Sequence, residues 1–98
     1  MIRSVIAVKF KPATTPEQTA ALVDAMRRFQ SEGLIRMDCG VDLGLREGNW
    51  DYCLTADFVD QDAYAHYDKD PEHNRIRRQI AAAITETAVR VQFEVPDL

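Results

Sequence analysis

Apolar residues stand at every second position in four separate stretches of the chain, and this alternation limits the fold more than any other feature. The stretches cover about residues 2–11, 35–43, 50–58 and 89–95. Successive side chains of a β-strand point to opposite faces, so each stretch predicts a strand with one apolar face. Two longer stretches, before the second strand and after the third, have apolar residues three and four positions apart, which is typical of helices. The predicted order of elements is therefore β-α-β-β-α-β.

The first helix is expected over about residues 16–32. Thr15 can cap its start, and Gln18 can complete a capping box three residues later. Pro16 suits the first helical position, and Gly33 stands where a C-terminal cap belongs. These signals place both ends of the predicted helix.

The second helical stretch is expected in two parts, because Pro71 interrupts it. Asp60 can cap a short helix that runs through Tyr67, and Asp70 can cap a longer helix that starts at the proline. One stripe of the longer helix is expected to face the core. This stripe carries His73, Ile76, Ile80, Ile84 and Thr87.

These elements in this order are typical of the split βαβ, or ferredoxin-like, α+β fold, in which helices cover one face of an antiparallel four-stranded sheet. The 98 residues, 46% hydrophobic and 29% charged, suffice for one domain over residues 1–98 with a modest core. Such a sheet has two unpaired strand edges, which association with a second copy would cover. We therefore expect a homodimer.

The two cysteines are expected to be free thiols. If the apolar faces of the second and third strands pair, Val41 lies opposite Tyr52. The same register places Cys39 opposite Leu54. Cys53 then points to the other face of the sheet from Cys39, and a disulfide cannot pass through the sheet.

The acidic balance of the chain argues against two classes of partner. Its 16 acidic and 12 basic residues give a formal net charge of −4, which offers no basic field for nucleic acid or an anionic membrane. No apolar run approaches the roughly 20 residues of a membrane span, and the first residues do not resemble a cleavable signal. We expect a cytoplasmic protein with neither nucleic acid nor a membrane as a partner.

Two segments of the chain resemble the stress-responsive A/B barrel domain (Dabb) family. They are the opening MIRSVIAVKFKP, residues 1–12, and the midpoint YDKDPEH, residues 67–73. Both occur at the spacing of that family, and the resemblance spans essentially the whole chain. It implies a dimeric α+β barrel, in which two four-stranded sheets join at their edges with the helices outside.

Within this family, plant polyketide cyclases of the olivetolic acid cyclase type use a tyrosine and a histidine of the midpoint motif. The matching residues here are Tyr67 and His73. The resemblance implies that His73 abstracts a proton beside a carbonyl group and that Tyr67 donates a hydrogen bond to the developing enolate. Aldol-type ring closure of a polyketide-like substrate would follow, without a cofactor.

The position of His73 bears on its charge. It stands third in its helix, where the free N–H groups and the helix dipole favour a neutral imidazole, whereas the neighbouring acids Asp70 and Glu72 favour the imidazolium. The alternative also remains open that His73 only completes the apolar stripe and that Tyr67 is an ordinary half-buried aromatic residue.

The pocket of such an enzyme would lie between the sheet and the helices. Its substrate-binding side chains would come from the first strand, the first helix and the last helix: Ser4, Ile6, Val8, Leu22, Met26, Ile76 and Ile80. The apolar members of this set also suit a plain core, and both interpretations remain open.

Neither a metal nor another cofactor is expected. Residues 66–73 contain five side chains of ligand type, but they lack a His-x-x-x-His pair or a comparable spacing. These side chains are His66, Asp68, Asp70, Glu72 and His73. The chain has no phosphate loop and no dinucleotide fingerprint.

Three function classes remain open, and the candidate ligand is a small apolar or aromatic molecule. The first is a cyclase-like enzyme that uses Tyr67 and His73, and the second is a cofactor-independent monooxygenase, which uses a similar dimeric barrel. The third is a non-catalytic stress-response or ligand-binding protein. Asp70 replaces a histidine usual in the family motif, and Ser4 replaces a histidine common in the first strand. These differences favour the third class.

Overall fold

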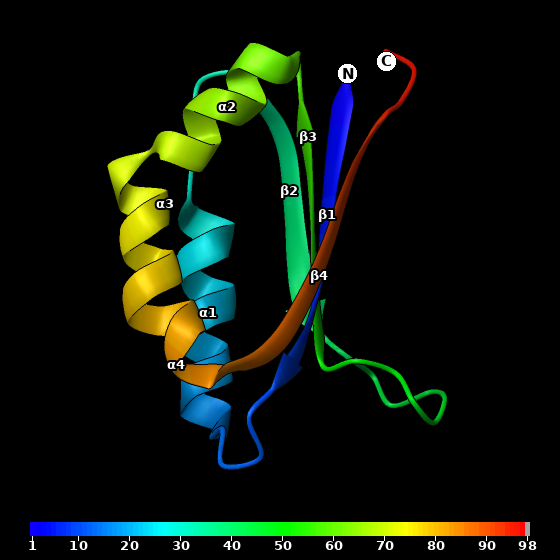
Figure 1. Cartoon of the computed structure of the whole chain (residues 1–98), viewed down its shortest axis with the longest axis vertical. Helices are drawn as coiled ribbons and strands as arrows, with labels where there is room; N and C mark the ends of the chain where they lie inside the picture. Colours follow the sequence, from blue (N-terminus) through cyan, green and yellow to red (C-terminus); the bar gives the residue numbers. More distant parts are fainter. Residues whose placement is uncertain (98) are drawn as a thin grey trace.

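Four antiparallel strands form the frame of the molecule in the computed structural model, which describes residues 1–97 (Figure 1). They are β1 (Ile2–Phe10), β2 (Leu34–Val41), β3 (Tyr52–Phe58) and β4 (Thr85–Glu94). Their order across the sheet is β2-β3-β1-β4, and every neighbouring pair is antiparallel. The predicted ferredoxin-like α+β fold is confirmed.

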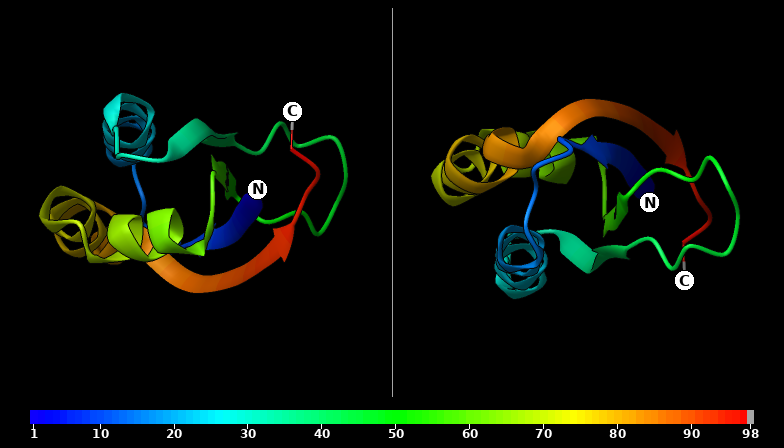
Figure 2. Two further views of the ribbon diagram at one scale, coloured as in Figure 1. Left: turned by 90° about the horizontal axis from the view of Figure 1, so that it is seen from above. Right: turned by 90° about the horizontal axis from the view of Figure 1, so that it is seen from below.

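The helical segments of residues 1–97 lie on one face of this sheet (Figure 2). They are α1 (Pro16–Arg28), α2 (Gln61–Lys69), α3 (Pro71–Ile76), the π-helix η1 (Arg77–Ala81) and α4 (Ala82–Ile84). The core lies between these helices and the sheet, with Phe58 and Ile84 fully buried. None of the helices described has the length and apolar character needed to cross a membrane.

The predicted helix starts are confirmed by their hydrogen bonds. At α1 the Gln18 amide donates to Thr15 Oγ1 over 3.2 Å, and the Thr15 amide donates to Gln18 Oε1 over 2.9 Å, which completes the capping box. Asp60 accepts a hydrogen bond from the Ala63 amide at the start of α2. Asp70 caps α3 in the same manner, so the chain breaks between α2 and α3 as predicted.

The end of α1 differs from the prediction of residue 32. The helix stops at Arg28, because Phe29 takes an extended backbone conformation and its ring is buried in the core. Gly33 therefore does not cap α1. It turns the chain into β2 with a φ of +82°, and an added Cβ would lie 2.5 Å from the Cβ of Ala63 in α2.

Gly33→Ala is expected to lower the free energy of unfolding by about 2–4 kcal/mol, because a left-handed backbone and overpacking both oppose a side chain there. Gly44→Ala is the matched control: Gly44 has a φ of +71° but no atom within 4 Å of the added Cβ. Its cost should be about 1 kcal/mol. Urea unfolding of both variants measures the difference, and equal costs would show that the contact with α2 is unimportant.

The register between β2 and β3 agrees with the prediction, whereas the predicted ends of β2 do not match the structure. Val41 lies opposite Tyr52 and Cys39 opposite Leu54, and both cysteines are free, with Cys39 buried and Cys53 exposed. The predicted apolar face of residues 35–43 does not hold at its ends, where Ile35 is 42% and Leu43 81% exposed. The register shifts between Leu34 and Arg36, and β2 stops at Val41, so both side chains leave the buried face.

Strand β4 turns its apolar side away from the helices. Val89, Val91 and Phe93 are 51%, 57% and 45% exposed. Arg90 lies opposite Ile6 of β1, and Gln92 lies opposite Ser4. Residues directly opposite each other in a sheet share a face, so the polar side chains of β4 face the helices.

Candidate functional site

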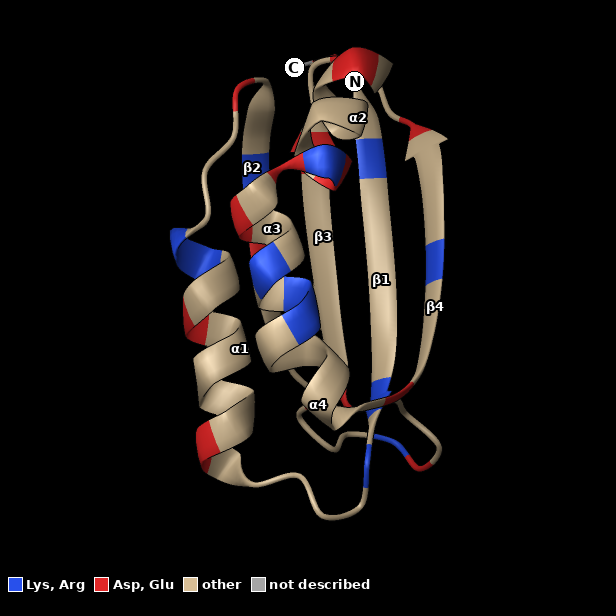
Figure 3. Cartoon of the chain, turned by 60° about the vertical axis from the view of Figure 1, so that its left-hand side comes forward, with Lys and Arg blue, Asp and Glu red and all other residues tan. Residues whose placement is uncertain are grey.

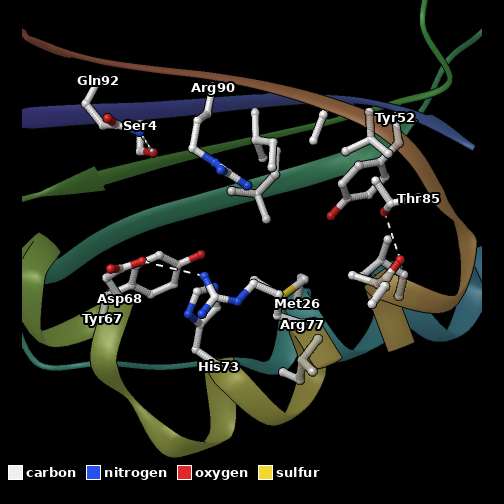
Figure 4. Close-up of a pocket in the computed structure, with 18 of the residues that line it drawn as sticks. Ser4, Met26, Tyr52, Tyr67, Asp68, His73, Arg77, Thr85, Arg90 and Gln92 are labelled. Carbon is white, nitrogen blue, oxygen red and sulfur yellow. Dashed lines mark hydrogen bonds and ion pairs between the residues drawn. The ribbon is translucent and has the colours of Figure 1, made fainter. Parts of the chain in front are cut away.

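A cavity of about 480 Å³ lies between the sheet and the helices (Figure 4). Its wall contains both residues predicted as catalytic, Tyr67 and His73. It also contains six of the seven residues predicted to contact a substrate: Ser4, Ile6, Val8, Leu22, Met26 and Ile76. The sheet and helices therefore do not pack shut, and the space between them reaches His73.

The seventh residue, Ile80, is partly buried against the core and does not line the cavity. Its prediction assumed α-helical spacing, but residues 77–81 form a π-helix, in which the turn contains one more residue. Ala81 and Ala82 therefore line the cavity instead, and their small side chains leave space for it. Thr87 was also placed wrongly on this helical stripe, because the helix ends at Ile84 and Thr87 lies in β4.

Tyr67 and His73 form a stacked pair in the cavity wall. Their ring centroids are 4.1 Å apart, with 31° between the ring planes. Tyr67 comes from the last turn of α2 and is held by Phe58, at 5.1 Å between ring centroids, and by Phe29, at 5.6 Å. His73 comes from the first turn of α3, where Asp70 Oδ1 accepts a hydrogen bond from its amide. The break between the two helices thus brings these rings together.

The surroundings of His73 favour its neutral form. Burial and the positive charge of Arg77 lower the pKa of His73 from its ordinary 6.5, against the opposing effect of Asp68 and Asp70. Its Nδ1 atom is buried and has no hydrogen-bond partner among residues 1–97. The buried Nδ1 leaves Nε2 as the ring nitrogen for contact with a ligand, and one nitrogen of a neutral imidazole can accept a proton.

The two buried phenols of the cavity remain protonated at neutral pH. Burial raises the pKa of Tyr67, and burial together with Cys39 raises the pKa of Tyr52. The Tyr52 hydroxyl is buried without a hydrogen-bond partner in the part of the chain described. Both hydroxyl groups point toward the cavity, and that of Tyr67 can donate a hydrogen bond to a bound molecule (Figure 4).

Seven other polar residues of the cavity wall were not predicted from the sequence: Tyr52, Tyr64, Asp68, Arg77, Thr85, Arg90 and Gln92. For Arg90 and Gln92 a signal existed, because the alternation of β4 separates them from Val89 and Val91. The alternation alone does not tell which side faces the helices. Gln92 donates a hydrogen bond to Ser4 Oγ over 3.2 Å, so the two residues form one polar rim.

The ligand-type residues of the midpoint do not gather into a metal centre. Residues 1–97 contain no group of three or more His, Cys, Asp or Glu side chains that could hold a metal ion. Asp68 instead lies 3.9 Å from Arg77, and Glu72 forms an ion pair with Arg75.

The sequence of the whole folded region identifies its family. The model of the stress-responsive A/B barrel domain (Dabb) matches residues 2–95. The chain belongs to this family. Comparison of this Dabb protein with curated proteins gives no match.

Solved structures share the fold of this Dabb protein over nearly its whole length. A dimeric ferredoxin-like protein from Thermobifida fusca is 28% identical, with a TM-score of 0.90 over 96% of this chain and 90% of its own. A dimeric protein of ferredoxin-like fold from Bacteroides fragilis is 18% identical, with a TM-score of 0.82 over 96% and 95% of the two chains. Hydroxynitrile lyase from Passiflora edulis is 14% identical, with a TM-score of 0.83 over 99% and 94%.

Proposed function

We propose that this Dabb protein binds a small apolar or aromatic ketone between its sheet and helices and abstracts a proton beside the carbonyl group. The observation that carries the proposal is the stacked pair of Tyr67 and His73 in the wall of a cavity of about 480 Å³. Burial lowers the pKa of His73, so its ring is available as a neutral base near pH 7 in the wall of this cavity.

The residues have separate roles in this chemistry. Neutral His73 takes a proton from the carbon beside a ligand carbonyl, which gives an enolate and an imidazolium. The protonated phenol of Tyr67 donates a hydrogen bond to the enolate oxygen. In a polyketide-like ligand the enolate carbon then attacks a second carbonyl carbon, a carbon–carbon bond forms, and the imidazolium returns its proton to the resulting alkoxide.

The similarity to hydroxynitrile lyase supports a catalytic function, because that enzyme has the same fold. The competing proposal is a non-catalytic ligand-binding protein with the same cavity. The two proposals differ in whether a bound ketone exchanges its protons.

An NMR experiment in D₂O distinguishes the catalytic from the non-catalytic proposal. It follows deuterium uptake at the terminal methyl group of 1-phenylbutane-1,3-dione. We expect the protein to raise the rate of uptake by about 100-fold or more over buffer, which is the usual scale for a positioned base. Binding of the diketone without faster uptake would favour the non-catalytic protein. Absence of binding would contradict the proposed ligand class.

We also propose that the protein is a homodimer. The face of β4 turned away from the helices exposes Val89, Val91 and Phe93, and such apolar surface suits association with a second copy. The similar proteins from Thermobifida fusca and Bacteroides fragilis are described as dimeric.

Light scattering at micromolar concentration is expected to give twice the mass of one chain. Phe93→Asp should shift the mass toward that of one chain, because a buried unpaired carboxylate opposes association. Glu86→Asp, an exposed change on the same strand, is the control. The mass of a single chain for the unmodified protein would contradict the dimer.

A further inference from the structure

Two arginines that the proposed proton transfer does not use reach the same cavity. Arg90 extends into it from β4, and Arg77 extends from η1 on the helical side (Figure 4). Figure 3 shows basic residues on both of these elements. Both arginines are exposed to solvent and stay charged, and their place in the cavity wall lets them meet an anionic group of a ligand.

Arg90 has no acidic partner in the described part of the chain. Among residues 1–97, no carboxylate lies within the 4.0 Å that defines an ion pair with its guanidinium. It lies opposite Ile6, whose side chain lines the cavity. The guanidinium therefore extends over the cavity with its hydrogen-bond donors free for a ligand.

Arg77 is held in place and only partly neutralised. It donates a hydrogen bond to Asn74 Oδ1 over 2.6 Å, whereas its distance to Asp68 Oδ1 is 3.9 Å, which is too long for a hydrogen bond. Arg77 and Asp68 are both about half exposed, so this ion pair is weak.

The charges that line the cavity do not balance. Arg77 and Arg90 contribute two positive charges and Asp68 one negative charge, while neutral His73 and the protonated tyrosines contribute none. The sum is one positive charge. A ligand with one negative charge would neutralise it.

We propose that Arg90, assisted by Arg77, binds the carboxylate of a ligand whose apolar or aromatic body lies in the cavity. The inference rests on the proposed function, because it requires that a ligand occupies this space. Leu22, Met26 and Ile76 give the ligand body apolar contacts, which disfavour a small hydrated anion such as phosphate. Planar guanidinium groups bind carboxylates through paired hydrogen bonds. The preferred substrate is therefore an aryl or alkyl keto acid, which binds more tightly than a neutral ketone of the same shape.

Calorimetric titration with 4-butylbenzoate and 4-butylbenzamide tests this proposal, because the two probes differ mainly in charge. We expect the unmodified protein to bind the benzoate at least about tenfold more tightly than the benzamide in dilute salt, the scale of a hydrogen bond to a charged group. Arg90→Gln should remove this preference and leave benzamide binding within about twofold of its original value. Arg78→Gln, an exposed arginine beside Arg77 that does not line the cavity, should keep the preference.

Any other result contradicts the proposed binding of a ligand carboxylate by Arg90 and Arg77. Equal binding of the two probes to the unmodified protein, or a preference that survives in Arg90→Gln, would remove Arg90 from ligand binding while leaving the cavity as a ligand site. Competition by inorganic phosphate at the same concentration as the benzoate would assign the arginines to a free anion instead. Failure of both probes to bind would contradict the ligand cavity itself, and with it the subsite.

Discussion

His73→Gln is expected to lower the protein-catalysed deuterium uptake of 1-phenylbutane-1,3-dione by about 100-fold or more, the scale of a positioned general base. Glutamine has a similar size but cannot accept the proton. His73 is only half buried, and its amide, rather than its ring, binds the capping carboxylate of Asp70. The fold should therefore persist, which circular dichroism and the thermal unfolding midpoint can verify.

Two further variants make this result specific. Tyr67→Phe removes only the hydroxyl and should lower the rate less than His73→Gln does. His66→Gln changes an exposed histidine of α2, outside the cavity wall, and should leave the rate unchanged. If His73→Gln lowered the unfolding midpoint but not the rate, His73 would have a structural role only.

Phe58→Ala is expected to lower the free energy of unfolding by about 3–5 kcal/mol, because it removes a large side chain from a site that cannot readily collapse. Phe58 is fully buried, and its ring contacts Tyr64 and Tyr67 at centroid distances of 5.6 and 5.1 Å. The same contact positions the phenol beside His73. Deuterium uptake should therefore also fall in the fraction of this variant that remains folded.

Leu45→Ala provides the comparison for Phe58→Ala. Leu45 is 80% exposed, so its truncation should change the free energy of unfolding by about 0.5 kcal/mol or less. Urea unfolding measures both variants. Similar costs for the two would mean that the core does not depend on the aromatic cluster around Phe58.

The fold could be predicted from the sequence because its signals are local. Alternation placed the strands, and the register of Cys39 with Leu54 followed from the pairing of two apolar faces. Asp60, Asp70 and Pro71 placed the break in the second helical stretch. The predicted end of α1 was wrong because it relied on Gly33 as a cap. The helix ends earlier, at Arg28, because Phe29 is buried in the core, and such a tertiary contact is not a local signal.

The candidate site was predictable in its Tyr67 and His73 pair and in most of its apolar residues, but not in its arginines. α-Helical spacing places Ile80 on the cavity face of the helix. Residues 77–81, RRQIA, form a π-helix instead, and no local sequence pattern predicts it. Ala81 therefore lines the cavity in place of Ile80. Arg90 was missed for a different reason: β4 has an apolar and a polar side, and polar residues are expected to face water. Here the polar side faces the cavity, which only the pairing of β4 with β1 reveals.

The pH dependence of deuterium uptake tests the role of His73 most directly. The fraction of neutral imidazole rises with pH through the pKa of His73 and is then constant. Because burial lowers this pKa below 6.5, the catalysed rate should be level above about pH 7.5 and fall toward lower pH, about tenfold per unit well below the pKa. His73→Gln should abolish this step. A catalysed rate that is constant between about pH 4 and 8, or that keeps the same step in His73→Gln, would contradict a histidine base in this protein.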